Sequence, residues 1–184
     1  MTTELEKGEL LHTGPGYLIF ATNDRAVAMM EWADECACRL SFQFHAVLGR
    51  HALRTNVLRK QGAHRLIVQR LQPLAVGLLA RAGANTADLQ FLGSEGRSLT
   101  KEQAAEIHGV TSQRVETIED TGLHAVRSLR AYLLAEGVEE LTLRLSFGVA
   151  PSGECEMQAI NPAECQLGSG DYNLLCERLG GDLK

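Results

Sequence analysis

The stretch LTLRLSFGVAPSGECEMQAI, residues 141–160, decides the fold that the sequence predicts. Apolar residues occupy every second position from Leu141 to Phe147, and polar residues such as Arg144 and Ser146 occupy the positions between them. Side chains alternate across a strand, so this pattern indicates a strand with one buried face. A Pro-Ser-Gly turn then leads into Glu154–Ile160, and the two runs together predict an antiparallel hairpin.

The N-terminal third predicts three more strands, followed by a helix. The strands are Glu9–Thr13, Tyr17–Thr22 and Ala26–Trp32, separated by Gly-Pro-Gly and Asn-Asp turns. Apolar residues then recur at helical spacing over about 41–61, which predicts one long helix ending at Gly62.

The middle of the chain predicts two strands, a loop and two helices. The strands are Arg65–Leu71 and Ala75–Ala82, and the Gly- and Ser-rich segment Gly83–Ser98 is typical of a loop. Thr100 and Gln103 form a capping box that opens a short helix to about residue 108. A longer helix capped by Thr111 or Ser112 extends to about 136, and a last helix is expected over about 172–179. This order predicts a single α+β domain over residues 1–184, with an antiparallel sheet flanked by helices.

Composition places the chain among ordinary globular proteins. It has 184 residues, 45% of them hydrophobic and 22% charged, with a formal net charge of -5. The negative charge argues against nucleic acid as a partner of the whole chain. No apolar run is long enough for a membrane helix, and MTTELEKGEL lacks the features of a signal peptide. We therefore expect a cytoplasmic protein without a membrane partner.

The cysteines and histidines indicate neither a disulfide framework nor a metal site. The five cysteines are odd in number and form no CxxC pair, and the six histidines form no cluster at ligand spacing. We therefore expect free thiols, as in a reducing cytosol, and neither a metal nor a cofactor.

The segment SLTKEQAAEIHGVTSQRVETIEDTGLHAVRSLRAYL, residues 98–133, resembles the helix-turn-helix of bacterial sigma-factor region 4. That resemblance implies a recognition helix beginning near Ser112 and a DNA-binding or sigma-like regulator acting through residues 100–133. Glu116, Glu119 and Asp120 crowd the same helix beside Arg114, however, and acidic side chains repel phosphate. The other interpretation is a helical hairpin packed on the sheet.

A second resemblance, to SAICAR synthetase, covers more of the chain. Residues 6–32, 64–81 and 139–167 follow in order the layout of that family, an ATP-dependent ligase of purine synthesis. Arg81 aligns with a substrate-binding arginine of the family. Its phosphate-holding lysines are replaced by Gly-Pro-Gly-Tyr at 14–17, and the acidic pair that holds magnesium is replaced by Gln158 and Ala159. The resemblance implies a non-catalytic protein that binds a purine-like metabolite.

In length and layout, the chain also resembles bacterial β-carboline-forming Pictet–Spengler enzymes of the marinacarboline-biosynthesis type. That family is homodimeric and cofactor-free, with an arginine on a mid-chain strand and a glutamate in the following loop. These roles would fall on Arg70, in HRLIVQRL, and Glu95, in GSEG. Asn85 stands near the place of a family histidine that this chain lacks.

Chemistry suits these two residues to that reaction. Condensing tryptophan with an aldehyde needs one group that exchanges protons near neutral pH, and one cation that holds a carboxylate. Desolvation in a partly apolar loop could raise the pKa of Glu95 toward neutrality. The alternatives are a solvated Glu95, and an Arg70 paired with an internal acid. Arg81 lies on the neighbouring strand, and the same reasoning makes it a substrate-contact candidate.

The sequence-based hypothesis is therefore a cofactor-independent Pictet–Spengler enzyme of alkaloid biosynthesis. Glu95 and Arg70 would be its catalytic residues, Arg81 and Asn85 would bind substrate, and the partners would be L-tryptophan, a small aldehyde and a second copy of the chain. The DNA-binding regulator and the non-catalytic SAICAR-synthetase-like protein are its alternatives.

Overall fold

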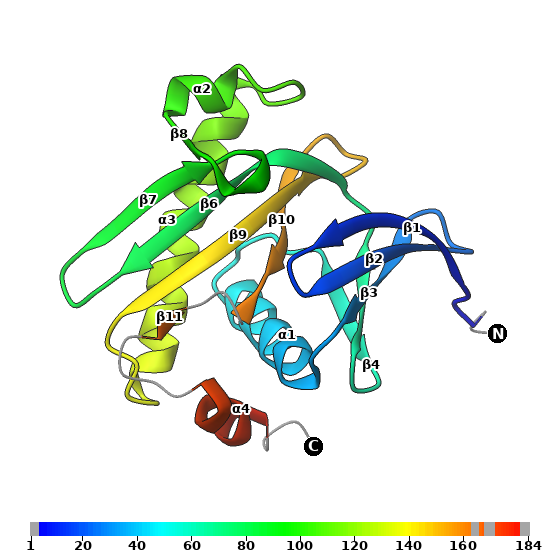
Figure 1. Cartoon of the computed structure of the whole chain (residues 1–184), viewed down its shortest axis with the longest axis horizontal. Helices are drawn as coiled ribbons and strands as arrows, with labels where there is room; N and C mark the ends of the chain where they lie inside the picture. The colour runs from blue at the N-terminus through cyan, green and yellow to red at the C-terminus, as the bar shows by residue number, and fades with distance from the viewer. Residues whose placement is uncertain (1–3, 163–165, 168–171, 181–184) are drawn as a thin grey trace.

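Two antiparallel sheets and four helices make up the computed structural model, which describes residues 4–162, 166–167 and 172–180 (Figure 1). The strands of the first sheet, in spatial order, are β1 (Lys7–Gly14), β2 (Tyr17–Thr22), β3 (Val27–Trp32), β5 (Arg65–Gln69) and β4 (Val57–Gln61). Those of the second are β10 (Cys155–Ile160), β9 (Leu141–Val149), β6 (Gln72–Ala82), β7 (Ala87–Leu92) and β8 (Ser98–Leu99), with β11 (Gln166–Leu167) also paired to β9. The α+β prediction is confirmed.

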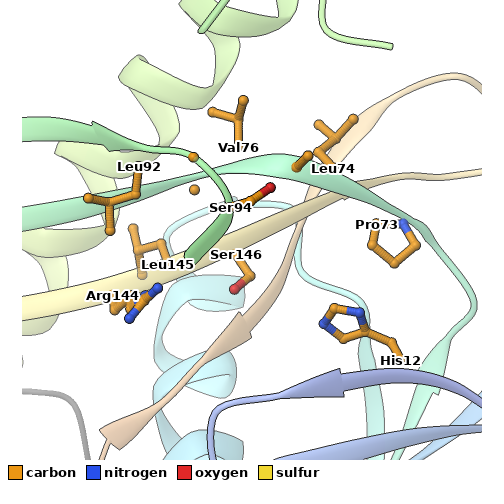
Figure 2. Close-up of a pocket in the computed structure, with 12 residues that line it drawn as sticks. His12, Pro73, Leu74, Val76, Leu92, Ser94, Arg144, Leu145 and Ser146 are labelled. Carbon is orange, nitrogen blue, oxygen red and sulfur yellow. The ribbon is translucent and has the colours of Figure 1, made fainter. Parts of the chain in front are cut away.

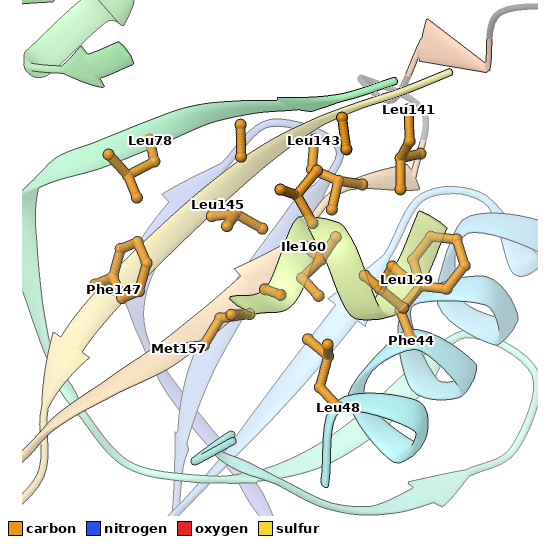
Figure 3. Packing of buried hydrophobic residues seen from close by; sticks show 14 of the residues in the cluster. Phe44, Leu48, Leu78, Leu129, Leu141, Leu143, Leu145, Phe147, Met157 and Ile160 are labelled. Carbon is orange, nitrogen blue, oxygen red and sulfur yellow. The ribbon is translucent and has the colours of Figure 1, made fainter. Parts of the chain in front are cut away.

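The hairpin that decided the prediction forms as expected. β9 and β10 pair antiparallel, with Val149 opposite Cys155 and Leu145 opposite Ile160. The apolar face of β9, from Leu141 to Phe147, is at most 1% exposed and packs in the main core (Figure 3). Alternation predicted this hairpin because it is a local property of the strand.

Helix α1 (Glu35–Arg50) begins and ends earlier than the helix predicted over 41–61. Asp34 caps it, accepting a hydrogen bond from the Cys36 amide at 2.7 Å. Beyond Arg50 the chain turns at Ala52, whose φ is 59°, and residues 57–61 form β4. The predicted end was wrong because pairing with β5 outweighs a helical spacing that Val57 continues by coincidence.

The segment predicted as a loop over 83–98 also contains regular structure. β7 pairs with β6 along its whole length, with Phe91 opposite Leu78. A short 3-10 turn, η1 (Ser94–Gly96), follows, and then β8. Polar and small residues around β7 (Gly83–Thr86 before it and Gly93–Ser98 after it) favoured a loop, and pairing with β6 defines the strand.

Helix α3 (Ser112–Leu134) lies along the six-stranded sheet, whereas α2 (Lys101–Ala105) is a short helix before it (Figure 1). The capping box at Thr100 and Gln103 is confirmed. The stripe from Val115 to Leu133 is buried, so the helical hairpin packs on the sheet. Its solvent side carries Glu116 and Asp120, and the prediction of DNA binding stays untested.

The main core fills the space between the six-stranded sheet, α1 and α3 (Figure 3). Phe44 and Leu48 of α1, Leu129 of α3 and Leu78 of β6 all belong to this one buried cluster. A second cluster lies under the five-stranded sheet, where Trp32 and Leu66 pack with Ala37 and Cys38 of α1, and the two clusters place α1 between the sheets.

The expectation that the cysteines are free thiols is wrong for one pair. Cys36 of α1 and Cys176 of α4 (Tyr172–Gly180) form a disulfide with Cα atoms 5.8 Å apart. No motif signals a pair separated by 140 residues, because only the fold brings them together. Among the described cysteines, Cys38 and Cys155 are free. None of the described helices is long and apolar enough to cross a membrane.

Candidate functional site

A cavity of about 370 Å³ lies between the β1–β2 hairpin of one sheet and strands β6 and β9 of the other. We call it the His12–Arg144 pocket. Besides those two residues, it is lined by Pro73–Gly77 of β6, by Leu92–Ser94 at the end of β7 and by Leu145 and Ser146 of β9. In Figure 2, His12 rises from β1 toward Ser146, with Pro73 on one side and Arg144 on the other.

The hairpin holds His12 over the second sheet. Its tip is a Gly-Pro-Gly turn in which Gly16 has a φ of +75°, a conformation that glycine adopts without strain. Asn161, at the end of β10, donates a hydrogen bond from Nδ2 to the Pro15 carbonyl at 2.7 Å. This contact fixes the tip of the hairpin against the six-stranded sheet.

His12 enters the pocket as a neutral ring at physiological pH. Burial lowers its pKa from the ordinary value of 6.5, because a partly enclosed site disfavours the charged imidazolium. Its ring centroid lies 6.2 Å from that of Tyr17. A neutral imidazole can both donate and accept hydrogen bonds, and its face can stack on a planar ligand.

Arg144 and Ser146 reach the pocket because they occupy the non-core face of β9. The same alternation that buries Leu143 and Phe147 turns these two side chains toward the cleft. The Arg144 guanidinium also passes close to η1, since a Cβ on Gly96 would lie 3.3 Å from Nη2. Both residues were predicted to lie on this polar face but not to belong to a site. Their place on the polar face of a half-buried strand was the one sequence feature that pointed to them.

A close approach of β6 to β9 shapes the floor of the pocket. A Cβ on Gly77 would lie 2.7 Å from the Leu145 carbonyl oxygen, closer than real Cβ atoms come. The register of the two strands shifts between Pro73 and Gly77, and this bulge bends β6 over the cleft.

A second cavity, of about 630 Å³, continues the cleft on the other side of Pro73, which lines both. We call it the Arg25–Arg70 cavity. Leu11, the linker residue Leu71 and Gln72 at the start of β6 form one part of its wall, and the end of β9 with the β9–β10 turn forms the other. Both arginines come from the five-stranded side of the molecule.

The residues of the cleft do not fit a magnesium ion, which the SAICAR synthetase resemblance implies. Among the residues that the structure describes, no aspartate or glutamate lines either cavity, and hard cations bind through carboxylate oxygens. Gln158 is 2% exposed, and its Oε1 has no hydrogen-bond partner in the described residues. It lies beside Gly148 and the linker residue Leu71, a neutral amide where the family carries an acid.

The residues predicted for catalysis do not converge. Arg70 lines the second cavity, whereas Glu95 is exposed on η1 and lines neither cavity. Arg81 is exposed on β6, 3.7 Å from Asp88 across the hairpin, and Asn85 is exposed in the β6–β7 turn. His12 and Arg25 were not predicted as site residues, because a lone side chain beside a turn carries no diagnostic pattern.

Comparisons with solved structures identify the fold. A phosphoribosylaminoimidazole-succinocarboxamide synthase from Ehrlichia chaffeensis is 12% identical, with a TM-score of 0.82, over 96% of this chain and 100% of that one. "SAICAR synthetase (Type-2) in complex with ADP" is 17% identical, with a TM-score of 0.77, over 96% of this chain and 99% of that one. SAICAR synthetase from Pyrococcus horikoshii OT3 is 18% identical, with a TM-score of 0.76, over 91% of this chain and 99% of that one. No family model and no curated protein matches the chain.

These matches overturn the Pictet–Spengler hypothesis. The similar structures are ligases of purine synthesis, so the prediction of a β-carboline-forming enzyme of alkaloid biosynthesis is wrong. Its support was chain length, layout and the separation of Arg70 from Glu95, properties that unrelated α+β chains share. The layout resemblance to SAICAR synthetase is confirmed at the level of structure. The chain therefore has the SAICAR synthetase fold.

Proposed function

We propose that this chain is a non-catalytic, SAICAR-synthetase-like protein that binds a purine-like, anionic metabolite in the cleft between its sheets. The observation that carries the proposal is the described lining of the His12–Arg144 pocket, whose polar side chains are one arginine, one neutral histidine and two serines. An arginine in such a setting favours an anionic group, and a neutral imidazole suits a planar heterocycle.

The fold supports a nucleotide-like ligand. One of the similar solved structures is described as a complex with ADP, and its fold extends over nearly the whole of this chain. The departures from the family support binding without catalysis. Phosphate transfer needs cations that neutralise the phosphates. Residues 14–17 include no lysine to supply such a charge, and residues 158–159 include no carboxylate to hold a metal ion.

The test is calorimetry and thermal unfolding of the intact chain with ADP, with magnesium and with EDTA. We expect ADP to bind and to raise the unfolding temperature equally in both, because the described lining of the cleft has no carboxylate to hold a metal. The same protein incubated with ATP should release no ADP or phosphate.

Two matched variants locate the binding. Arg144→Gln should weaken ADP binding about tenfold, the loss expected for a charge-assisted hydrogen bond. Arg127→Gln removes the same charge from an exposed position on α3 that lines neither cavity, and should leave binding unchanged. Absence of any ADP binding by the wild-type chain, or equal binding by the Arg144→Gln variant, refutes the proposal.

A further inference from the structure

Arg25 and Arg70 lie together at the far end of the cleft, although 45 positions apart in the sequence. Arg25 belongs to the β2–β3 loop, and Arg70 follows β5 in the linker to β6. The Arg70 amide donates a hydrogen bond to the Ala26 carbonyl at 2.9 Å, continuing the pairing of Val27 with Gln69. The backbone therefore holds the two arginines on adjacent segments.

Neither arginine side chain has an ion-pair or hydrogen-bond partner in the part of the chain that the structure describes. Asp24 and Glu154, each next in sequence to a lining residue, do not themselves line this cavity. Asp24 accepts a hydrogen bond from the Ala26 amide at 2.9 Å, and Glu154, beside the cavity wall, forms an ion pair with Arg54. Two positive charges thus face a cavity whose described lining residues include no aspartate or glutamate.

This arrangement is electrostatically incomplete. Guanidinium groups bind carboxylate and phosphate bidentately, and two of them on one cavity repel each other until an anion lies between them. Arg70 is half-buried, and the rest of the wall includes Leu11, Pro73 and Val149. The apolar wall excludes part of the water that would otherwise screen the charges.

We propose that Arg25 and Arg70 form an oxyanion-binding subsite that takes a second carboxylate or phosphate group of the cleft metabolite. The assignment of both groups to one ligand rests on the proposed function. Because Pro73 lines both cavities, the subsite adjoins the His12–Arg144 pocket. The ligand is then an anion at two separated points, with its planar part between them.

The probes are inorganic phosphate and succinate, titrated separately into 15N-labelled protein while the arginine Nε–Hε signals are followed by NMR. Loss of one signal in each of Arg25→Gln and Arg70→Gln assigns the two resonances. We expect both signals to shift with a common dissociation constant, and each substitution to weaken that constant about tenfold. Arg127→Gln is the control of equal charge and should titrate as the wild type does.

The two anions distinguish the chemistry of the group: tighter phosphate binding identifies a phosphate subsite, and tighter succinate binding a carboxylate subsite. Unmoved Arg25 and Arg70 signals with both anions overturn the proposal, as does unchanged affinity in the substituted proteins. Arg25 lies in an exposed loop, so its variant decides the matter even where Arg70→Gln disturbs folding. Phosphate binding here without ADP binding at Arg144 refutes the proposed function but leaves the subsite standing.

Discussion

Cys36 and Cys176 form a disulfide that ties helix α4 to the start of helix α1 across 140 residues of sequence. The buried side chains of α4, including Leu175 and Leu179, belong to the main core. The bond therefore anchors the C-terminal helix to the helix that lies between the two sheets.

Breaking this bond should destabilise the fold. A cross-link that closes so long a loop restricts the unfolded chain, and Cys36→Ser should lower the free energy of unfolding by about 3 kcal/mol. Urea denaturation with and without dithiothreitol measures the effect. The wild type and the Cys155→Ser control, which lacks only a free thiol, should both lose stability on reduction, whereas Cys36→Ser should not respond. A wild-type urea midpoint that is the same with and without dithiothreitol contradicts the prediction.

His45 should make the protein sensitive to mild acid. The side chain is 2% exposed in α1, neither ring nitrogen has a hydrogen-bond partner in the described residues, and burial lowers its pKa from 6.5 to about 4. A depressed pKa in the folded state means that the unfolded state binds the proton more readily. Stability is therefore full above pH 6.5 and falls as the pH drops toward 4, by on the order of 3 kcal/mol.

His45→Leu should abolish that loss, because the leucine carries no proton-binding group and leaves no polar atom buried without a partner. Urea midpoints measured between pH 7 and pH 4 provide the test. His51→Gln, which removes an exposed histidine one turn and a half further along, should keep the pH dependence of the wild type. Equal pH profiles for His45→Leu and wild type would mean that another group titrates.

The sequence pattern predicted those elements that depend only on residues close together in the sequence. The β9–β10 hairpin and the capping box at Thr100 depend on neighbours in the sequence, and both were predicted. The end of α1 and the existence of β7 depend on pairing with β5 and β6, which propensity does not show. Prediction failed where a partner strand decides the conformation.

The cleft was harder to predict than the strands that build it. Arg70 was singled out and does line a cavity, but its companion there is Arg25, which lies on a loop 45 positions away. Glu95 follows an apolar strand, a context that suggested enclosure, yet η1 turns it outward, with a φ of 60°. The direction of a loop side chain depends on backbone dihedrals that the sequence pattern leaves open.

Two glycines should respond oppositely to the same substitution. A Cβ on Gly77 would lie 2.7 Å from the Leu145 carbonyl oxygen, so Gly77→Ala should force β6 and β9 apart and cost about 2 kcal/mol. Gly49, in helix α1, has nothing within 4 Å of its ideal Cβ, and Gly49→Ala should stabilise by about 0.5 kcal/mol. Urea denaturation of both variants tests the pair, and a neutral Gly77→Ala contradicts the close packing described above.

Asn161 should couple the hairpin to ligand binding. Its Nδ2 donates a hydrogen bond to the Pro15 carbonyl at 2.7 Å, and the side chain is buried. Asn161→Ala should therefore lower the free energy of unfolding by about 1 kcal/mol. Loss of this hydrogen bond also loosens the turn that holds His12 over the pocket. ADP affinity should therefore fall several-fold even when all of the variant protein is folded. Calorimetry at 10 °C, where the variant is fully folded, separates the two effects. His108→Ala, an exposed change beyond α2, serves as the control. An Asn161→Ala protein that binds ADP as tightly as the wild type would show that the hairpin tip does not organise the site.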